Sequence, residues 1–297
     1  MGQTPFILCS EPKPMNSAKP SRSRRWLRSA VRVVVGAYLL IVLLMTVFQR
    51  QILFLPTKMP LAEAQRIAAD QGFSPWFAVG GGFMGWQLPA PVPARGSVLI
   101  VHGNGGTALY EMGLAETVKG ALGLDAYLLE YPGFGPRGGK PTETSLLAAA
   151  DEAFEHLPTN RPVYVVSESL GTGVAAHLAQ KYPARVAGLV MFVPYDRLAS
   201  VAQSQYPFLP AYWLLWDRFD PTDWLKDYRG PVKIVVAGSD EVIPPERGKK
   251  LYENYPGPKS LQIIVGAGHG GTFGQSPQWW REVQAFWQAN ERGNTTG

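Results

Sequence analysis

The chain has 297 residues, of which 46% are hydrophobic and 17% charged, so it can bury a large core and lacks the composition of a disordered protein. The formal net charge is +5, but residues 1–32 hold seven of the 28 basic residues and one of the 23 acidic residues. The rest of the chain is therefore almost neutral, which argues against a nucleic-acid partner, because such a partner requires a basic face on the fold.

The N-terminal part divides into a tail and an apolar stretch. Residues 1–25 are polar and basic, and they are predicted to form a disordered tail. Residues 26–50 include an uncharged run from Val33 to Phe48, which spans about 24 Å as a helix and can be lengthened by flanking residues. We therefore predict a transmembrane helix over residues 26–50, since a bilayer core is about 30 Å thick.

The apolar stretch could be a membrane anchor or a cleaved signal peptide. A cleavage site needs small residues at set positions, and residues 45–51 offer none, which favours a signal anchor. Five arginines lie between residues 22 and 32, before the apolar run. Because basic flanks remain in the cytoplasm, we expect a cytoplasmic N-terminus and a periplasmic or otherwise extracytoplasmic domain after the helix.

Residues 51–292 alternate between strand-like and helix-like segments, and we expect residues 293–297 to form a short flexible tail. This alternation predicts an α/β fold with a mostly parallel sheet and helices on both faces. The predicted strands cover residues 80–88, 97–101, 127–131, a run from 163, 189–193, 232–236 and 261–265, and the clearest helices cover 61–71, 145–157 and 172–181.

A strand, a tight turn with a serine and a helix follow one another at residues 163–181. The turn reads Ser-Glu-Ser-Leu-Gly over residues 167–171, and this context is typical of a nucleophile elbow. The residues two before and two after the nucleophile must be small, which Ser167 and Gly171 satisfy around Ser169. Ser169 is therefore the candidate nucleophile, although a simple turn with a helix-capping serine is the plainer interpretation.

An activated serine needs a base and an acid that orients the base. Asp240 follows the predicted strand 232–236, and His269 lies among glycines after the predicted strand 261–265. Ser169, Asp240 and His269 thus come at strand ends in the chain order expected for this fold. Two carboxylates compete with Asp240: Asp196, for which a helix N-cap is the more economical role, and Glu241, one residue further along.

A glycine-rich loop, His-Gly-Asn-Gly-Gly, follows the strand at 97–101. The tetrahedral intermediate of acyl transfer needs backbone N–H donors aimed at its oxygen. We predict that the N–H groups of Asn104 and Leu170 form this oxyanion hole. His102 is expected to pack and hydrogen-bond within the loop.

Residues 195–229 interrupt the alternation of strands and helices with many aromatic residues and prolines. We expect a small cap over the site, which would supply an apolar substrate pocket and exclude water. The candidate pocket residues are Tyr206, Phe208, Tyr212 and Trp213. Core packing is the alternative role for about half of the aromatic residues in this segment.

Metal and cofactor signals are absent from the sequence. The single cysteine, Cys9, excludes an internal disulfide framework, and no Cys/His cluster has metal-ligand spacing. No G-x-G-x-x-G sequence lies between a strand and a helix. We therefore expect no metal and no cofactor.

Taken in order, these motifs resemble the α/β-hydrolase superfamily over roughly residues 50–290. They read HGNGG from His102, LLEYPGFG from Leu128, GKPTE from Gly139, SESLGTG from Ser167, DEVIP from Asp240 and GAGH from Gly266. More narrowly, the chain is similar to N-terminally anchored α/β-hydrolase-domain proteins, a group with monoacylglycerol and lysophospholipid lipases and protein depalmitoylases. Ser167 stands where that pattern has its first glycine.

The resemblance and the residues together imply a membrane-anchored serine hydrolase. The expected substrate is a carboxylic ester or thioester with an apolar acyl part, cleaved through an acyl-enzyme. A serine peptidase of the same fold is one alternative. A non-catalytic scaffold is another, because a fold does not fix a function.

Overall fold

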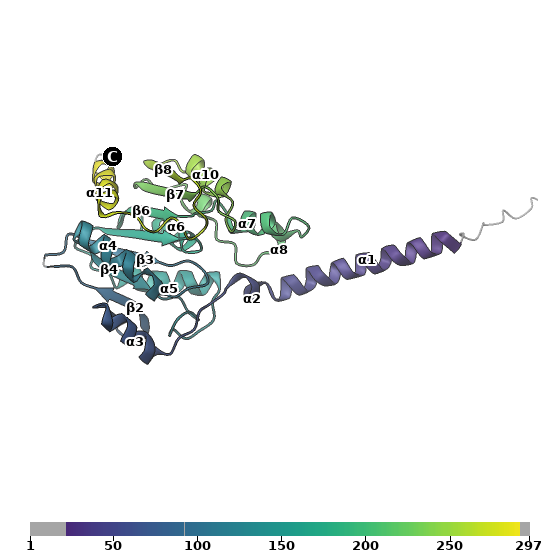
Figure 1. Cartoon of the computed structure of the whole chain (residues 1–297), viewed down its shortest axis with the longest axis horizontal. Coiled ribbons are helices and arrows are strands. Elements are labelled where there is room, and N and C mark those ends of the chain that lie inside the picture. The colour runs from purple at the N-terminus through teal and green to yellow at the C-terminus, as the bar shows by residue number, and fades with distance from the viewer. Residues whose placement is uncertain (1–21, 92, 292–297) are drawn as a thin grey trace, which may run out of the picture. The chain divides into compact units, whose positions relative to one another are not determined.

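The computed structural model describes residues 22–91 and 93–291 (Figure 1). Residues 1–21 of the predicted N-terminal tail and the whole predicted tail at 293–297 lie outside this range. The chain divides into two compact units, residues 1–45 and 46–297.

The first unit consists, in its described part, of most of the helix α1 (Arg22–Val47). This helix begins four residues before the boundary predicted at residue 26. Its stretch Arg25–Val47 has 23 residues, is strongly apolar and is the one helix of the described residues that could cross a membrane. At 1.5 Å per residue the stretch is about 35 Å long, enough for a bilayer core. A signal sequence near an N-terminus has the same properties.

The second unit is built on an eight-stranded sheet in the order β1-β2-β4-β3-β5-β6-β7-β8. The strands from β4 to β8 run parallel, whereas β1 and β2 pair antiparallel at one edge. This is the α/β-hydrolase fold that the sequence predicts. The strands are β1 (Ser74–Phe77), β2 (Phe83–Leu88), β3 (Ser97–Val101), β4 (Asp125–Leu129), β5 (Val163–Glu168), β6 (Val186–Phe192), β7 (Val232–Ala237) and β8 (Lys259–Ile264).

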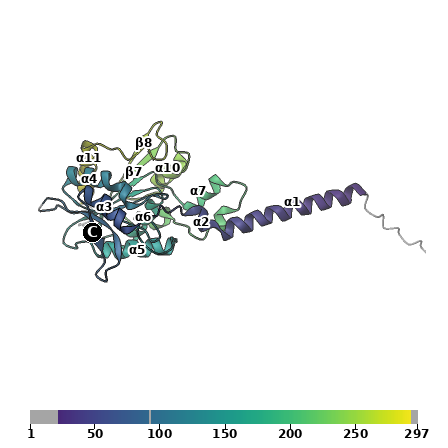
Figure 2. The same ribbon diagram turned by 60° about the horizontal axis from the view of Figure 1, so that its bottom comes forward.

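Helices cover both faces of this sheet, and β7, β8 and α10 gather at one end of it (Figure 2). Helices α3, α4 and α11 pack on one face, and α5, α6 and α10 pack on the other. The helices are α2 (Gln49–Leu53), α3 (Leu61–Asp70), α4 (Met112–Leu122), α5 (Glu143–Glu155), α6 (Gly171–Lys181), α7 (Leu198–Gln205), α8 (Ala211–Leu214), α9 (Pro221–Trp224), α10 (Pro245–Asn254) and α11 (Pro277–Glu291), with a 3-10 turn η1 (Ala108–Glu111).

Alternation along each strand divides the core into two layers. In β3, Val98 and Ile100 pack under α3, α4 and α11, whereas Leu99 and Val101 pack under α5 and α6. All five residues of β3 are buried, as expected for a central parallel strand that is covered on both faces. The strand β1 was not predicted, because it has four residues and carries Pro75, which is tolerated only at a sheet edge.

The predicted cap at 195–229 consists of α7, α8 and α9 with irregular connections. The buried carboxylate of Asp217 joins three segments there. It accepts hydrogen bonds from Arg50 Nε (2.7 Å) in α2 and from the backbone N–H of Glu143 (2.8 Å) at the start of α5. Gln49 adds a second link, since it accepts from the backbone N–H of Trp216 (2.7 Å). The cap is therefore fixed to the segment that follows α1.

Replacing Asp217 should loosen this junction. Asp217→Ala leaves Arg50 and the backbone N–H of Glu143 without their acceptor. We therefore expect the free energy of unfolding to fall by about 2 kcal/mol and the melting temperature to fall by about 5 °C. Asp223→Ala is the matched control, because its ion pair with Lys226 is exposed and is worth about 0.5 kcal/mol or less. Equal shifts for the two variants, measured by intrinsic fluorescence in detergent, would contradict the role of Asp217.

Candidate active site

Ser169 lies in a strained turn between β5 and α6. Its φ angle is +47°, a left-handed conformation that costs a non-glycine residue about 1–3 kcal/mol and is concentrated at functional sites. The turn is held by a hydrogen bond from the backbone N–H of Ser169 to Phe192 O (3.0 Å) and by one from Thr172 Oγ1 to Ser169 O (2.7 Å). The backbone at the predicted nucleophile thus has elbow geometry.

Small residues flank this turn for different reasons. A Cβ at Gly171 would lie 2.3 Å from Val101 O, so α6 can begin against the end of β3 only with glycine at that position. Ser167 replaces the usual glycine and is buried, and its Oγ donates to Val190 O (3.1 Å) in β6. This bond satisfies the hydroxyl of Ser167 within the sheet.

The structure brings Ser169, His269 and Asp240 into one hydrogen-bonded chain. Ser169 Oγ lies 3.1 Å from His269 Nε2, and His269 Nδ1 lies 2.8 Å and 3.0 Å from the two carboxylate oxygens of Asp240. A carboxylate only accepts, so Nδ1 carries the proton and Nε2 is left to accept from the serine hydroxyl. This arrangement is that of a nucleophile, a base and an orienting acid.

The environment of Asp240 keeps its carboxyl group ionised. Burial raises the pKa of Asp240. The hydrogen bond with His269 and those from the backbone N–H groups of Ile243 and Val242 lower this pKa by more than burial raises it. The pKa of Asp240 therefore lies below its ordinary value. Both backbone bonds are 2.8 Å long and end on Oδ1. The carboxylate is therefore charged throughout the neutral range and can stabilise an imidazolium on His269.

The two competing carboxylates have other surroundings. Asp196 is fully buried and faces Arg247 Nη1 (3.6 Å) and Lys250 Nζ (3.5 Å) of α10. Its expected role as a helix cap is wrong, because Arg197 occupies the N-cap position of α7 and no side chain caps that end. Glu241 lies beside Gly268, where its carboxyl oxygens are 3.3 Å and 3.6 Å from the position of a Cβ.

The glycine-rich loop after β3 lies next to the elbow. Asn104 uses its side chain to hold the segment after α2, accepting from Leu55 N (3.0 Å) and donating to Leu53 O, which the sequence did not reveal. The ring of His102 is buried, with Nδ1 2.7 Å from Gly103 O and Nε2 3.2 Å from Glu130 Oε1. His102 thus packs and hydrogen-bonds within the loop, as predicted. Leu170 begins the turn into α6 directly after Ser169.

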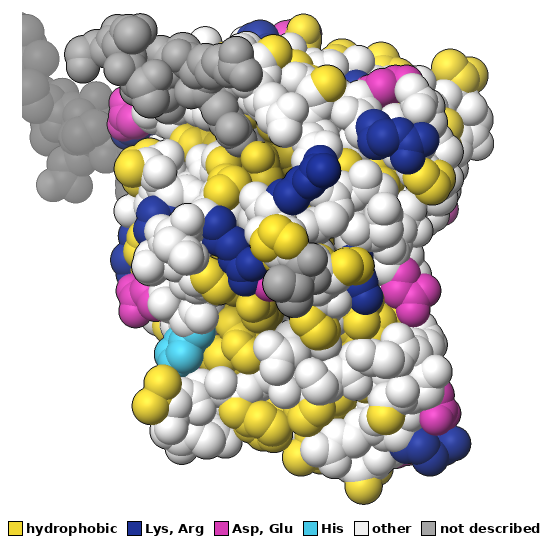
Figure 3. All heavy atoms as spheres, turned by 90° about the vertical axis from the view of Figure 1, so that its left-hand side faces the viewer, with side chains coloured by type: hydrophobic (Ala, Val, Ile, Leu, Met, Phe, Trp, Pro, Cys, Tyr) yellow, Lys and Arg dark blue, Asp and Glu magenta, His cyan; other side chains and the backbone are white. Residues whose placement is uncertain are grey.

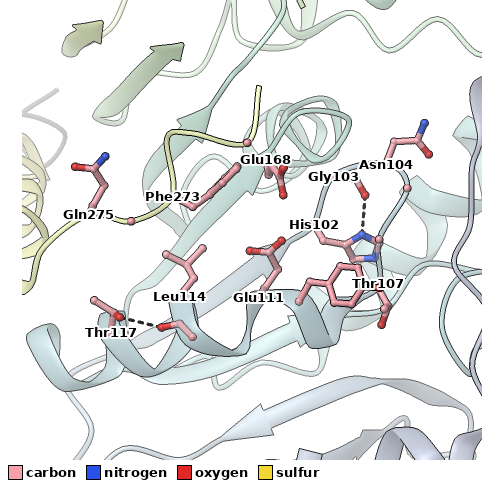
Figure 4. Close-up of a pocket in the computed structure, with 16 residues that line it drawn as sticks. His102, Gly103, Asn104, Thr107, Glu111, Leu114, Thr117, Glu168, Phe273 and Gln275 are labelled. Atoms are coloured by element: carbon pink, nitrogen blue, oxygen red, sulfur yellow. Dashed lines mark hydrogen bonds between the residues drawn. The ribbon is translucent and has the colours of Figure 1, made fainter. Parts of the chain in front are cut away.

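A cavity of about 520 Å³ opens beside these residues (Figure 4). Glu168 and Gly270, the chain neighbours of Ser169 and His269, form part of its wall. Its other lining residues are His102, Gly103, Asn104, Gly105, Gly106, Thr107, Tyr110, Glu111, Gly113, Leu114, Thr117, Phe273, Gly274 and Gln275. The sequence predicted neither Glu111 nor Glu168 as part of a site; Glu168 stands inside the elbow motif, whereas nothing in the pattern marks Glu111.

The candidate pocket residues of the cap do not line this cavity. Phe208 and Trp213 are 63% and 79% exposed, and Tyr206 is half-buried. Tyr212 lines a separate cavity of about 280 Å³ together with Arg197, Ala199, Arg218 and Asp220. Their role in binding substrate stays a prediction.

On the face of the molecule in Figure 3, basic side chains are scattered among acidic, polar and apolar ones. Over residues 22–91 and 93–291, no group of three or more His, Cys, Asp or Glu side chains could hold a metal ion.

Comparison with known proteins agrees with this architecture. A family model described as the alpha/beta hydrolase fold matches residues 96–211. An uncharacterised protein of Mycobacterium tuberculosis (strain H37Rv) is 31% identical over 228 residues, which cover 74% of this chain and 80% of that protein. The lysophosphatidylserine lipase ABHD12 of Danio rerio is 29% identical over 190 residues, which cover 55% of this chain and 48% of that lipase.

A solved structure of similar fold is that of an esterase of Pyrococcus furiosus. It has a TM-score of 0.58 and 16% sequence identity and covers 75% of this chain and 95% of its own. With this fold, this site geometry and these relatives, the chain belongs to the α/β-hydrolase superfamily.

The geometry ranks Asp240 above Asp196 in its effect on Ser169. Asp240→Asn disturbs the tautomer of His269, so the rate at which a fluorophosphonate labels Ser169 should fall by about a thousandfold or more. Asp196→Asn should leave that rate within about threefold and lower the melting temperature, because it removes the charge of a buried carboxylate that faces Arg247 and Lys250. Gel-based labelling over time measures the labelling rate of both variants. A larger loss of labelling rate in Asp196→Asn than in Asp240→Asn would assign the acid to Asp196.

Proposed function

We propose that this protein is a serine hydrolase that cleaves a carboxylic ester or thioester through an acyl-enzyme. The observation that carries the proposal is the hydrogen-bonded series Ser169–His269–Asp240, with Ser169 held at positive φ at the end of β5. The family supports a hydrolase, and the lipase and esterase among the similar proteins support an acyl substrate.

In the first half of the reaction, Ser169 Oγ attacks the acyl carbonyl carbon while its proton passes to His269 Nε2. The carbonyl oxygen becomes an oxyanion, and Asp240 stabilises the imidazolium that forms on His269. Collapse of the tetrahedral intermediate breaks the bond to the alcohol or thiol, which takes the proton from Nε2. The acyl group remains on Ser169 as an ester.

The oxyanion is assigned to the backbone N–H groups of Leu170 and Asn104. Leu170 follows the nucleophile, and Asn104 lies in the loop after β3, the two places from which this fold supplies such donors. The bonds of the Asn104 side chain to Leu53 and Leu55 support the assignment, because they hold the loop in place. One such donor is typically worth about a hundredfold or more in turnover.

In the second half, His269 removes a proton from a water molecule, and the hydroxide attacks the acyl-enzyme. The second tetrahedral intermediate collapses, the proton returns to Ser169 Oγ, and the carboxylic acid leaves. The ionised Asp240 again stabilises the charged imidazole. Each residue thus repeats its role, and no cofactor is needed to balance the reaction.

A lipid-like ester with an apolar acyl part is the proposed substrate class. The relative named as a lysophosphatidylserine lipase supports it, and so does α1, which would keep the enzyme at a membrane where such esters reside. A peptidase of the same fold is the second candidate. A non-catalytic scaffold is the third, and the complete hydrogen-bonded series argues against it.

Ser169→Ala should abolish fluorophosphonate labelling and ester hydrolysis, because no other hydroxyl is hydrogen-bonded to His269 in the described residues. Ser167→Ala is the matched control: it removes one buried hydrogen bond and should keep more than about a tenth of the activity. A panel of p-nitrophenyl esters and aminoacyl anilides separates an esterase from a peptidase. Loss of labelling in Ser167→Ala but not in Ser169→Ala would identify Ser167 as the nucleophile.

We assign α1 the role of a signal anchor with its N-terminus in the cytoplasm. The arginines between residues 22 and 32 lie before the uncharged run that begins at Val33, whereas Arg50 and Lys58 are the only basic residues in the first twelve positions after Val47. Basic residues that flank a span resist translocation. This asymmetry supports an extracytoplasmic hydrolase domain.

A reporter that is active only after export, fused after residue 297, should therefore be active, and a reporter that works only in the cytoplasm should be silent. The protein should stay in the membrane pellet after a carbonate wash. Recovery in the soluble cytoplasmic fraction would exclude both anchor and orientation. A shortened soluble exported form would instead identify α1 as a cleaved signal.

A further inference from the structure

Polar groups make up about half of the wall of the cavity beside the elbow. Six of its sixteen lining residues are glycines, which expose backbone N–H and C=O groups, and seven more are polar or ionisable. Only Tyr110, Leu114 and Phe273 are apolar. An acyl chain cannot satisfy such groups and would leave them desolvated at a cost. The cavity therefore suits the alcohol part of an ester better than the acyl part.

Two glutamates meet in this wall. Glu111 ends η1, just before α4, and is 8% exposed. Glu168 ends β5, just before Ser169. Both residues line the cavity, and their side chains point toward one another in Figure 4. The absence of a side chain at Gly103 leaves room for Glu168, because a Cβ there would lie 3.1 Å from its carboxyl carbon.

Glu111 keeps its proton at neutral pH. Burial, the charge of Glu168 and the hydrogen bond with Glu168 raise the pKa of Glu111 to about 9. Glu111 is therefore a neutral group that faces the carboxyl group of Glu168. Other ionisable groups packed nearby are Tyr131, Glu130 and His102, and none of the sixteen lining residues is Lys or Arg. Two carboxyl groups thus line the cavity, and its wall includes no lysine or arginine.

We propose that Glu168, held by Glu111, is a specificity-determining residue that makes the cavity accept an uncharged, hydroxyl-bearing alcohol part of the ester and reject an anionic one. Hydroxyl groups can donate to the carboxylate of Glu168, whereas a phosphate group would meet like charge. The inference rests on the proposed serine hydrolase and adds the substrate's headgroup to it.

The test compares two lipids with the same acyl chain, 1-oleoylglycerol and 1-oleoylglycerol 3-phosphate, in micelles of an uncharged detergent with the full-length protein. Oleate release should give a kcat/KM for the neutral lipid about tenfold or more above that for the anionic lipid, the size expected of like charges several ångströms apart at an effective dielectric constant near 20. Glu168→Gln should reduce this ratio about fivefold or more, mainly by improving cleavage of the anionic lipid. Glu116→Gln, an exposed change on α4, should leave the ratio unaltered.

A second measurement tests the proton on Glu111 and does not depend on activity. Between the ordinary pKa of a glutamate and about 9, the folded protein holds one proton more than the unfolded chain, so its stability falls as pH rises. Glu111→Gln binds no such proton. Its melting temperature should therefore exceed that of the unaltered protein by a margin that grows from pH 5 to pH 9, and Glu116→Gln should show no such trend.

Equal or better cleavage of the anionic lipid by the unaltered protein would overturn the inference, and so would an unchanged ratio in Glu168→Gln or a flat difference in melting temperature for Glu111→Gln. If Glu168→Gln does not fold, the inference is still tested by the kcat/KM ratio of the unaltered protein and by the melting temperatures of Glu111→Gln between pH 5 and pH 9. Fluorophosphonate labelling of Ser169 separates the two proposals. If Ser169 is labelled but the neutral lipid is not preferred, only the headgroup assignment is wrong. If Ser169 is not labelled, both the headgroup assignment and the proposed serine hydrolase are wrong.

Discussion

The contact between the elbow and the end of β3 is the constraint on which the site depends. With Gly171 against Val101 O, α6 can start beside β3, and Ser169 is forced into a left-handed turn. Because β3 and β5 are parallel neighbours, the same contact brings the glycine-rich loop after β3 next to the nucleophile. Two neighbouring strand ends thus deliver both the serine and the donors proposed for the oxyanion.

The parallel direction of β5, β7 and β8 explains how residues 100 positions apart can share hydrogen bonds. Their carboxyl ends open at one edge of the sheet, where loops carry Ser169, Asp240 and His269. β6 lies between β5 and β7 in the sheet, yet Asp196 in the loop after it faces α10. Asp240 and Asp196 both follow a strand, but only Asp240 reaches His269, because the partners of each carboxylate fix its direction.

Two regions of opposite character surround this edge. On one side lies the cavity, whose wall includes six glycines and the Glu111–Glu168 pair. The cap carries exposed aromatic side chains such as Trp213 and is joined through Asp217 to the segment after α1. A lipid ester has the same division between a polar alcohol part and an apolar chain. Under the proposed function, the alcohol part of such a molecule would lie in the cavity.

The sequence by itself determined the fold class, the elbow and the chain order of Ser169, Asp240 and His269, because strand, turn and glycine requirements are local and leave local patterns. The boundaries of most predicted strands lie within three residues of the observed ones. Strand β1 was not predicted, because it has only four residues and one of them is Pro75. Only the tertiary structure decided that Asp196 pairs with α10, that Asn104 holds the chain after α2, and that Glu111 meets Glu168. These contacts join residues distant in the chain, so their partners, burial and charge exist only once the sheet has assembled.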